Sequence, residues 1–475
     1  MPIKPKLRPY QREGIIHTIN QPFAGLFYDP GLGKTLTTLL SFELLRMRER
    51  LQRPRMLVVA PLLVAQSVWA QEAQKWTHTS HLTTLLLWAR TRKGKEALLP
   101  GIHTHDITVI NYEGLKWLEE NLPRDEWPWD VLVLDELSKC KDSTTQRAKI
   151  LNRIRNHFTR IWGLTGTPAP NSCMELFGQI KVLDGGASLG KSLWTFRQTH
   201  FYQKPYDKYK WYLRPGHDDI IADKIAHLVH RLKARDHLDM PDLIDIWHKV
   251  PVSRKDMNTY LELEKESYLQ LSTQTEASAV SAGVLWGKLQ QVCQGFLYED
   301  QDIPTPQKPV HRINEAKLDV LEDIIEEAAG QPVLVFYKFH ADLEALRGRF
   351  HGRGNVPLGV CTKDMPTEEL VQRWNNKEIQ VLLANPQSAS HGLNIQEGGN
   401  IMVWYCLDSS NERDLQSKGR LERQGQEAAT VINHHLEIPG TVDSDIKDVL
   451  EGRATMQERL LSKWAQYVPS ERAKA

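Results

Sequence analysis

The sequence predicts an α/β fold with two parallel-sheet lobes and helical insertions between them. Short, β-rich apolar runs alternate with helical stretches in the first third of the chain, at 24–27, 56–60, 107–110, 131–134 and 161–164. A second set of such runs comes late in the chain, at 333–336, 381–384, 402–405 and 430–433. This alternation is typical of parallel sheets whose strands are joined by crossover helices.

Between these two regions the strand signal fades into charged helical sequence, which ends in a proline-rich stretch at 303–310. The 475 residues are enough for about three domain-sized units. We therefore expect four segments: a first lobe at 1–184, helical insertions and a linker at 185–307, a second lobe at 308–440 and a helical tail at 441–475.

Composition excludes several classes of protein. Hydrophobic residues make up 41% of the chain and charged residues 25%, which are globular values rather than those of low-complexity or coiled-coil proteins. Lys and Arg number 60 against 59 Asp and Glu, which leaves a net charge of +1. Because the whole molecule has no strong positive field, any nucleic-acid-binding surface must be local.

The cysteines and the apolar stretches give further expectations. The five cysteines are scattered, and none has the Cys/His spacing of a zinc site, so we expect a reduced protein without zinc. The N-terminal residues are polar, and no stretch is apolar enough to serve as a signal region or long enough to span a bilayer. We therefore expect no membrane association and a cytoplasmic location.

A glycine-rich loop follows the first predicted strand and precedes a helix-compatible run at 36–46. Glycines let backbone amides turn inward around phosphates, and the N-terminus of the helix adds its positive dipole end. Although Tyr28 stands where the strict pattern has a glycine, the order of strand, loop and helix favours a nucleoside-triphosphate site over an ordinary turn. The predicted phosphate-binding residues are Gly31, Leu32, Gly33, Lys34 and Thr35, with Lys34 reaching the β/γ-phosphates and Thr35 also binding Mg²⁺.

Two carboxylates follow the predicted strand at 131–134. Asp135 and Glu136 would lie at the carboxyl edge of a parallel sheet, where such sheets bind ligands. Asp135 would hold the metal through its hydration shell, and Glu136 would orient and deprotonate the water that attacks the γ-phosphate. A strand that ends in Asp-Glu is by itself usually only a solvated strand end. Together with the phosphate loop, the pair indicates triphosphate hydrolysis.

The ordered motifs of the chain resemble those of the Swi/Snf-type branch of the superfamily-two helicase-like ATPases. The resemblance implies two RecA-like lobes, ATP and Mg²⁺ as cofactors, and a polynucleotide track. The matching segments are 7–11 (Q motif), 29–35 (motif I), 58–61 with Trp69, Glu72 and Trp76 (Ia), 109–113 (Ib), 134–139 (II), 164–168 (III), 335–337 (IV), 388–394 (V) and 414–426 (VI).

The resemblance also implies roles for single residues. Gln11 would read adenine, Gly392 would contact the nucleotide, and Thr165 and Thr167 would couple the nucleotide to the DNA. Arg420 and Arg423 stand three apart, which on a helix places two positive charges on one face, as a developing phosphate charge requires. By family analogy Arg423 is the arginine finger and Arg420 its partner. The alternative is a solvated basic helix face.

The sequence departs from the family pattern at three positions. The family usually has histidine where Ser138 stands, and an acidic residue or alanine where Pro30 and Tyr28 stand. A serine can hydrogen-bond but cannot be protonated near neutral pH. The departures bear on how strongly ATP is coupled to the track. They do not indicate an inactive ATPase, because the catalytic residues are present.

The stretch 191–216 is rich in both basic and aromatic residues. Its lysines would neutralise phosphates, and its aromatic rings would either stack on bases or pack an inserted helical subdomain. The resemblance, which places a protrusion beside the duplex here, favours contact through the lysines and packing by the aromatic rings. The predicted DNA-binding residues are Lys204, Lys208 and Lys210, together with Thr165 and Thr167.

We therefore expect a DNA-dependent ATPase that translocates along DNA as ATP binding and hydrolysis close and release the two lobes. Duplex DNA is the expected partner, with single-stranded DNA as a second possibility, and the sequence does not identify a recruiting protein. The alternatives are a strand-separating or strand-annealing helicase, and a nucleotide-gated DNA-binding scaffold. Motif VI resembles that of compact bacterial and bacteriophage versions, which implies a location at the nucleoid or in a phage-infected host cell.

Overall fold

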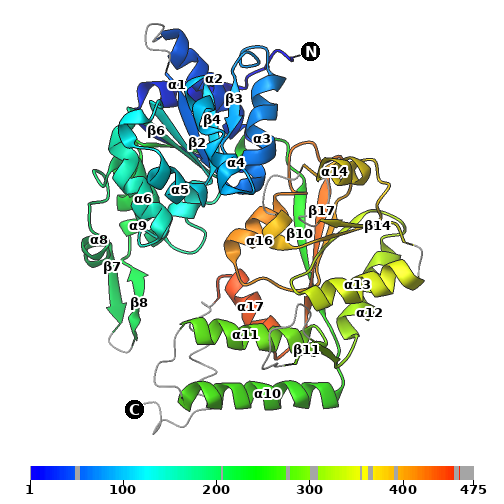
Figure 1. Ribbon diagram of the computed structural model, residues 1–475. Coiled ribbons are helices and arrows are strands. Elements are labelled where there is room, and N and C mark those ends of the chain that lie inside the picture. Colours follow the sequence, from blue (N-terminus) through cyan, green and yellow to red (C-terminus); the bar gives the residue numbers. More distant parts are fainter. Residues whose placement is uncertain are drawn as a thin grey trace. The chain divides into compact units, whose positions relative to one another are not determined.

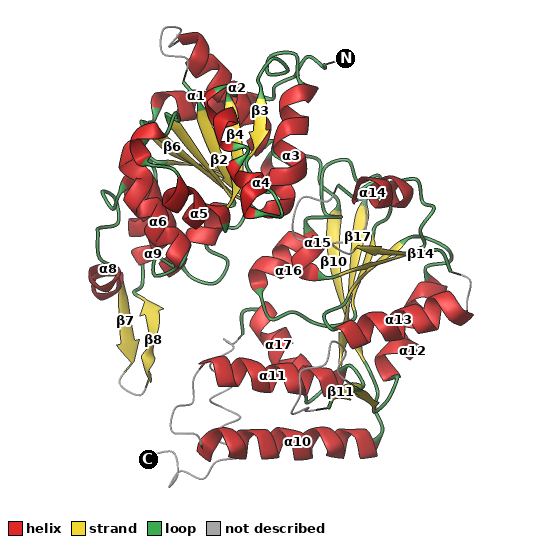
Figure 2. Cartoon of the chain, in the orientation of Figure 1, coloured by secondary structure: helices red, strands yellow, loops and turns green. Residues whose placement is uncertain are grey.

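The computed structural model describes residues 2–48, 54–204, 207–273, 279–299, 309–353, 356–361, 367–389, 394–453 and 459. The chain divides into two compact units, Met1–Leu238 and Asp239–Ala475. Each unit contains a large parallel sheet with helices on both faces (Figures 1 and 2). The predicted α/β fold with two parallel-sheet lobes is confirmed.

The sheet of the first unit has seven parallel strands in the order β3-β4-β2-β5-β6-β1-β9. The central strands are continuous apolar runs because helices cover both of their faces. The sequence predicts five of the strands and misses the short, partly exposed β3 and β9. The bounds are β1 (Phe23–Tyr28), β2 (Met56–Ala60), β3 (Thr84–Leu86), β4 (Ile107–Asn111), β5 (Val131–Asp135), β6 (Arg160–Thr165) and β9 (Val229–Leu232).

The helices of the first unit form two layers. One layer contains α1 (Pro9–Asn20), α2 (Lys34–Arg48) and α3 (Leu62–Lys75), and the other contains α5 (Gly114–Asn121), α6 (Gln146–Ile154) and α7 (Leu176–Asp184). The short α4 (Arg92–Glu96) precedes β4, and α8 (Leu193–His200) and α9 (His217–Ile225) follow α7. The hydroxyl of Thr145 caps the N-terminus of α6, and Gly185, with φ of 73°, ends α7.

The sheet of the second unit has six parallel strands in the order β10-β17-β16-β13-β15-β14. The bounds are β10 (Asp242–Lys249), β13 (Val333–Phe336), β14 (Leu358–Cys361), β15 (Val381–Ala384), β16 (Ile401–Trp404) and β17 (Thr430–Glu437). A separate antiparallel pair joins β11 (Phe296–Tyr298) to β12 (Val310–Arg312).

The helices of the second unit also lie on both faces of its sheet. On one face lie α12 (Ala316–Glu327) and α13 (His340–Arg353), and on the other α14 (Thr367–Asn375), α15 (Pro386–Ala389) and α16 (Asn411–Lys418). Two long helices, α10 (Arg254–Thr273) and α11 (Ala279–Cys293), pack together, and α17 (Val442–Leu450) contacts α11. In the part of the chain that the structure describes, no helix is long and apolar enough to cross a membrane.

The segment 185–307 differs from the helical insertion that the sequence predicts. It contains β9, which extends the first sheet, and β10, which pairs with β17 along its whole length in the second. The division between the units falls between Leu238 and Asp239, inside this segment. The strand signal of β10 is hidden because β10 is an edge strand in which Asp245 and His248 interrupt the apolar residues.

An antiparallel hairpin of β7 (Phe201–Lys204) and β8 (Asp207–Leu213) stands out from the first unit beside α8 (Figure 1). Phe201, Trp211 and Leu213 pack against the core of the unit. This contact anchors the hairpin, because an isolated two-stranded hairpin is at best marginally stable in water.

An ion pair is buried in the core of the second unit. Lys317 Nζ lies 2.7 Å from Asp443 Oδ2, and the two side chains are 1% and 0% exposed. Burial lowers the pKa of Lys317, but the Asp443 carboxylate outweighs this effect and the net pKa lies above its ordinary value. Both side chains are therefore charged, and their ion pair joins α12 to the N-terminus of α17.

We predict that Lys317→Met destabilises the second unit by about 3–5 kcal/mol, because it leaves the Asp443 carboxylate buried without its cation. The measurement is urea unfolding of the full chain. The matched control is Lys116→Met, which breaks an exposed pair with Glu120 at 3.7 Å and should cost less than about 1 kcal/mol. Equal effects of the two substitutions would contradict the prediction.

Candidate nucleotide site and nucleic-acid interface

The phosphate loop joins the end of β1 to the first residue of α2. Gly31 and Gly33 have φ of 89° and 77°, which residues with a Cβ rarely adopt. Lys34 Nζ donates hydrogen bonds to the carbonyl oxygens of Tyr28, at 2.7 Å, and Asp29, at 3.4 Å. The loop residues Leu32 and Thr35 complete the turn into α2. A loop of this kind at a helix N-terminus can hold an anion with its backbone amides and its lysine.

Gln11 on α1 lies against this loop. Its Oε1 accepts from the backbone N–H of Arg8 at 3.0 Å, and its Nε2 lies 3.5 Å from the carbonyl oxygen of Leu32. A Cβ added to Gly33 would lie 2.5 Å from Gln11 Nε2, so a larger residue there would displace the glutamine side chain, and the φ of 77° also favours glycine. The structure thus brings the predicted adenine-reading glutamine together with the phosphate loop.

Tyr28 does not obstruct the loop, although it replaces a glycine of the strict pattern. Its side chain is fully buried, its hydroxyl lies 2.7 Å from His230 Nδ1 on β9, and it packs against Gly14 of α1. Burial raises the pKa of Tyr28 well above its ordinary value. The neighbouring Asp29 is held by the turn that follows β9, since its Oδ2 accepts from the N–H of Ala234 at 2.9 Å.

Asp135 lies at the carboxyl end of β5. Its Oδ2 accepts a hydrogen bond of 2.9 Å from Nε1 of the buried Trp69 on α3. Burial raises the pKa of Asp135 to about 6, against the opposing effects of the Trp69 bond and the Lys34 ammonium. The hydroxyl of Tyr112 donates to the carbonyl oxygens of Asp135 and Glu136 at 3.1 and 3.2 Å. Trp69 and Tyr112 fall in the sequence motifs Ia and Ib, but sequence reasoning gives them no role in this site.

Glu136 has a left-handed backbone, with φ of 64° and ψ of 63°. Its Oε1 accepts from the Ser138 hydroxyl at 2.5 Å and from the Thr165 hydroxyl at 3.1 Å. Two donors on one oxygen fix the orientation of the carboxylate. The serine at the family's histidine position therefore contacts the predicted base directly, a contact that spacing alone does not reveal.

The structure corrects the prediction that Thr165 contacts DNA. Thr165 is 0% exposed, and its hydroxyl bonds to Glu136 and accepts from the N–H of Thr167 at 3.2 Å. Gly166 lies close to Pro30 of the phosphate loop, because a Cβ there would be 3.2 Å from Pro30 Cδ. The end of β6 is thus part of the nucleotide site, and Thr167 is only partly exposed beside it.

The motif VI arginines of the second unit do not share a helix face, contrary to the sequence prediction. Helix α16 ends at Lys418, and Arg420 and Arg423 lie in the turns that follow Gly419. Arg420 is 7% exposed, whereas Arg423 is half-buried and donates from Nη1 to Asn394 Oδ1 of motif V at 2.9 Å. The helix stops because Gly419 is a poor helix former. Gly392 lies outside the described residues.

In the β7–β8 hairpin some residues pack against the core and others face solvent. Tyr202 pairs directly with Tyr212 across the strands, with ring centroids 5.7 Å apart, and Lys204 Nζ lies 4.3 Å from the Tyr212 ring centroid. Lys208, Lys210 and Tyr212 stand at every second position of β8. The side chains of Lys208 and Lys210 lie outside the described residues. Trp194 on α8 is 68% exposed.

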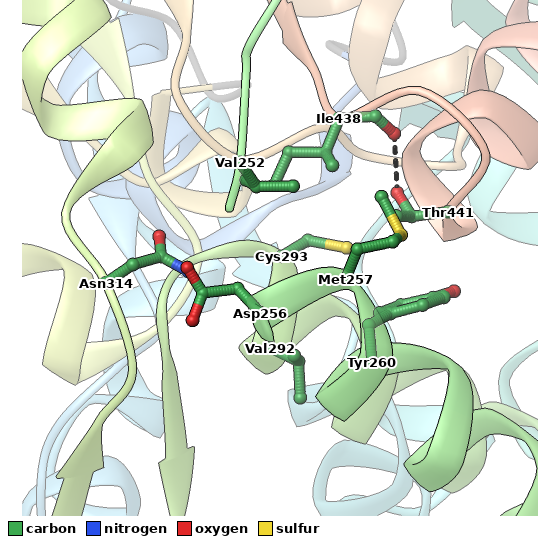
Figure 3. A pocket seen from close by; sticks show the side chains of 9 residues that line it. All are labelled: Val252, Asp256, Met257, Tyr260, Val292, Cys293, Asn314, Ile438 and Thr441. Atoms are coloured by element: carbon green, nitrogen blue, oxygen red, sulfur yellow. Dashed lines mark hydrogen bonds between the residues drawn. The ribbon is translucent and has the colours of Figure 1, made fainter. Parts of the chain in front are cut away.

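A small pocket in the second unit lies apart from the motifs (Figure 3). Its lining comes mainly from α10, α11 and the turn before α17, where the Thr441 hydroxyl donates to the Ile438 carbonyl oxygen at 2.7 Å. None of the nine lining residues belongs to one of the predicted motifs. They are Val252, Asp256, Met257, Tyr260, Val292, Cys293, Asn314, Ile438 and Thr441.

Comparison with models of protein families shows to which family the chain belongs. The model of the SNF2-related domain matches residues 10–295, and that of the helicase conserved C-terminal domain matches residues 316–425. The chain belongs to the SNF2-related family. The predicted resemblance is confirmed, and this SNF2-related chain is an ATPase, so its use of ATP follows from the family.

Relatives of the SNF2-related chain come from phage, bacteria and eukaryotes. Protein p41 of Acyrthosiphon pisum secondary endosymbiont phage 1 is 30% identical over 466 residues, which cover 96% of this chain and 97% of p41. The ATP-dependent helicase/translocase YwqA of Bacillus subtilis is 24% identical over 96% of this chain and 49% of YwqA. The ISWI chromatin-remodeling complex ATPase ISW1 of Saccharomyces cerevisiae is 22% identical over 96% of this chain and 40% of ISW1.

The chain therefore spans less than half the length of the YwqA and ISW1 relatives. Among solved structures, the Sulfolobus solfataricus SWI2/SNF2 ATPase core in complex with dsDNA aligns with a TM-score of 0.43 at 19% identity. That alignment covers 99% of this chain and 96% of the archaeal chain.

We predict that Ser138→Ala lowers the kcat of ATP hydrolysis about tenfold and leaves the KM for ATP nearly unchanged. A hydrogen bond to a charged group contributes roughly 1.5–3 kcal/mol, and its loss frees the Glu136 carboxylate to rotate. Steady-state hydrolysis with saturating polynucleotide checks this. Thr199→Ala, which removes a hydroxyl from the exposed surface of α8, is the control. An unchanged kcat in Ser138→Ala would show that Thr165 alone orients the carboxylate.

Proposed function

We propose that this SNF2-related ATPase is a translocase that hydrolyses ATP to move along duplex DNA and to remodel DNA or protein–DNA complexes. The observation that carries the proposal is the position of Glu136, which two hydroxyls hold at the carboxyl edge of the sheet that also carries the phosphate loop. Two of the relatives are named as a helicase/translocase and a chromatin-remodeling complex ATPase, which supports movement on DNA.

The residues of the first unit fit ATP with Mg²⁺. The Asp135 carboxylate is buried, and burial raises its pKa to about 6, so a bound cation would favour its charged form. Thr35 in the first turn of α2 and Asp135 would hold Mg²⁺, and Gln11 would read the adenine. When bound, the ion neutralises charge on the phosphates. Lys34 and the amides of Gly31 and Gly33 would hold the β- and γ-phosphates.

Hydrolysis needs a base and positive charge at the γ-phosphate. Glu136 would orient the attacking water and accept its proton, with its carboxylate fixed by Ser138 and Thr165. Arg423, as the finger, and Arg420, as its partner, would stabilise the charge that develops on the phosphate. The bond from Thr165 to Glu136 joins motif III to the base, which offers a physical route by which DNA engagement near Thr167 alters hydrolysis.

The interface for DNA would include the hairpin face that carries Tyr202 and Tyr212, with phosphates neutralised by Lys204, Lys208 and Lys210. Phe201 and Trp211 pack against the core of the first unit, which supports this assignment because these aromatic residues serve packing and leave the lysines for contact with DNA. With a net charge of +1, the chain needs such a local positive surface to bind a polyanion.

Two other functions are distinguishable from this proposal. A strand-separating or strand-annealing helicase would release or pair single strands, which a displaced-strand assay detects. A nucleotide-gated DNA-binding scaffold would keep its activity when hydrolysis stops, so it would survive Glu136→Gln. The hydroxyl bonds that hold Glu136 favour an enzyme over a scaffold, because a scaffold needs no oriented base.

We predict that duplex DNA stimulates ATP hydrolysis by the wild type and not by Lys34→Ala, because the substitution removes the cation that holds the β- and γ-phosphates. The measurement is the rate of phosphate release at low salt, alone and with duplex DNA, single-stranded DNA or RNA. Stimulation by single strands or RNA alone would support the helicase. The absence of stimulation by all three would contradict a translocase that works without a partner protein.

We predict that replacing Lys204, Lys208 and Lys210 by Gln weakens duplex binding and flattens the salt dependence of the affinity. Each lost phosphate contact removes roughly 0.9 from the slope of log K against log salt concentration. Fluorescence anisotropy at several salt concentrations measures the slope. Replacement of Lys93, Lys95 and Lys116 by Gln, on α4 and α5 of the same unit, is the control. An unchanged slope in the hairpin variant would assign the hairpin to packing alone.

A further inference from the structure

A network of charged and polar side chains crosses the edge of the second sheet. Asp245 on β10 is at its centre, and its Oδ1 accepts from Asn433 Nδ2 at 2.6 Å and from His435 Nε2 at 2.9 Å, both on β17. Lys418 Nζ, at the last residue of α16, lies 3.3 Å from the same oxygen. Three donors from two elements thus converge on one carboxylate oxygen.

The sheet holds the histidine of this network rigidly. His435 is 1% exposed, and its ring stacks on Trp247 of β10 with centroids 4.2 Å apart and planes 14° apart. The Trp404 ring, on the neighbouring strand β16, is parallel to the His435 ring, and the two centroids are 6.5 Å apart. The register places these three rings side by side on adjacent strands. The packed neighbours hold the His435 ring, so its Nε2 has a fixed position beside the Asp245 carboxylate, whose side chain is 41% exposed.

Asp245 stays ionised in this setting. Burial raises the pKa of its carboxyl, but the bonds from His435 and Asn433 and the charge of Lys418 together hold the pKa far below its ordinary value. An ionised carboxylate with one fixed oxygen is a good anchor for an ammonium group.

Lys418 connects this anchor to motif VI. Its Nζ also lies 3.0 Å from Oδ2 of Asp414, one turn earlier on α16, and its side chain is only 16% exposed. The next turn is hydrogen-bonded to the end of the helix, since the N–H groups of Arg420 and Leu421 donate to the carbonyl oxygens of Ser417 and Lys418. Because these bonds start from the last residues of α16, the contacts that hold Lys418 also set the direction in which the chain leaves the helix.

We propose that Asp245 and Lys418 are positioning residues that set the place of Arg420 and Arg423 through the end of α16. The inference rests on the proposed function, because it needs these arginines to act in hydrolysis. Asp245 lies outside every sequence motif, seven positions after Leu238, the last residue of the first unit, and 173 positions before Lys418. Only the pairing of β10 with β17 brings it to motif VI.

The test compares Lys418→Met and Asp245→Asn with wild type in DNA-stimulated ATP hydrolysis. Both substitutions keep the size of the side chain and remove the charge pair. We expect kcat to fall about tenfold in each, with the KM for ATP within about twofold of wild type, and Lys418→Arg to restore most of the rate.

The matched control is Lys447→Met. Lys447 is also a partly buried lysine of this neighbourhood, 2.8 Å from Glu437 of β17 and over the ring of Trp247, but it leads to no motif. Thermal unfolding of Lys447→Met and Lys418→Met should give similar losses of Tm. If Lys447→Met lowers kcat as much as Lys418→Met does, the loss of activity comes from general destabilisation, and the proposal is overturned.

Substitution of the arginines themselves separates this inference from the proposed function. Arg423→Ala, which removes the proposed finger, should lower turnover by on the order of 10³-fold. If Lys418 acts through the two arginines, adding Lys418→Met to the variant Arg420→Ala/Arg423→Ala should slow it no further, whereas a further fall would overturn the positioning role. If Arg423→Ala hydrolyses ATP at the normal rate, the proposed role of motif VI fails and the positioning role fails with it. If Arg423→Ala is slow and Lys418→Met is normal, only the positioning role fails.

Discussion

The left-handed backbone of Glu136 is the constraint on which the nucleotide site depends. A glutamate in this conformation costs of order 1–3 kcal/mol, and it persists only where the surroundings over-determine it. Those surroundings are visible: the Tyr112 hydroxyl bonds the carbonyl oxygens on both sides of the turn, and Thr165 and Ser138 bond the side chain. A relaxed backbone would aim the carboxylate elsewhere, so the residue that follows β4 and the ends of β5 and β6 together set the orientation of one carboxylate.

The same dependence explains how the sequence could predict one half of the site. Glycines at positive φ, a lysine at the start of a helix and acids at the end of an apolar strand are local patterns, and each was predicted at the position where the structure has it. The donors that hold these groups come from distant segments. Trp69 is 66 positions from Asp135, and Thr165 is 29 positions from Glu136, so their roles follow only from the order of strands in the sheet.

The fold shows the same division between local and distant information. Buried central strands such as β2 and β13 are continuous apolar runs and were predicted with the bounds that the structure has. Strand β10 was missed because half of its surface faces solvent and Asp245 belongs to a polar network rather than to the core. The helical prediction for Arg420 and Arg423 was wrong because spacing cannot show that Gly419 ends α16.

Two of the three departures from the family pattern, at Tyr28 and Ser138, have different physical meanings. Tyr28 is buried between β1 and α1, bonded to His230, so it strengthens the attachment of the Gln11 helix without entering the phosphate loop. Ser138 instead bonds Glu136, the proposed base, and it replaces a side chain that could carry a proton. A hydroxyl can fix the carboxylate but cannot change its charge near neutral pH. If Glu136 is the base, motif III would therefore act on hydrolysis through the orientation of this carboxylate rather than through a titrating partner.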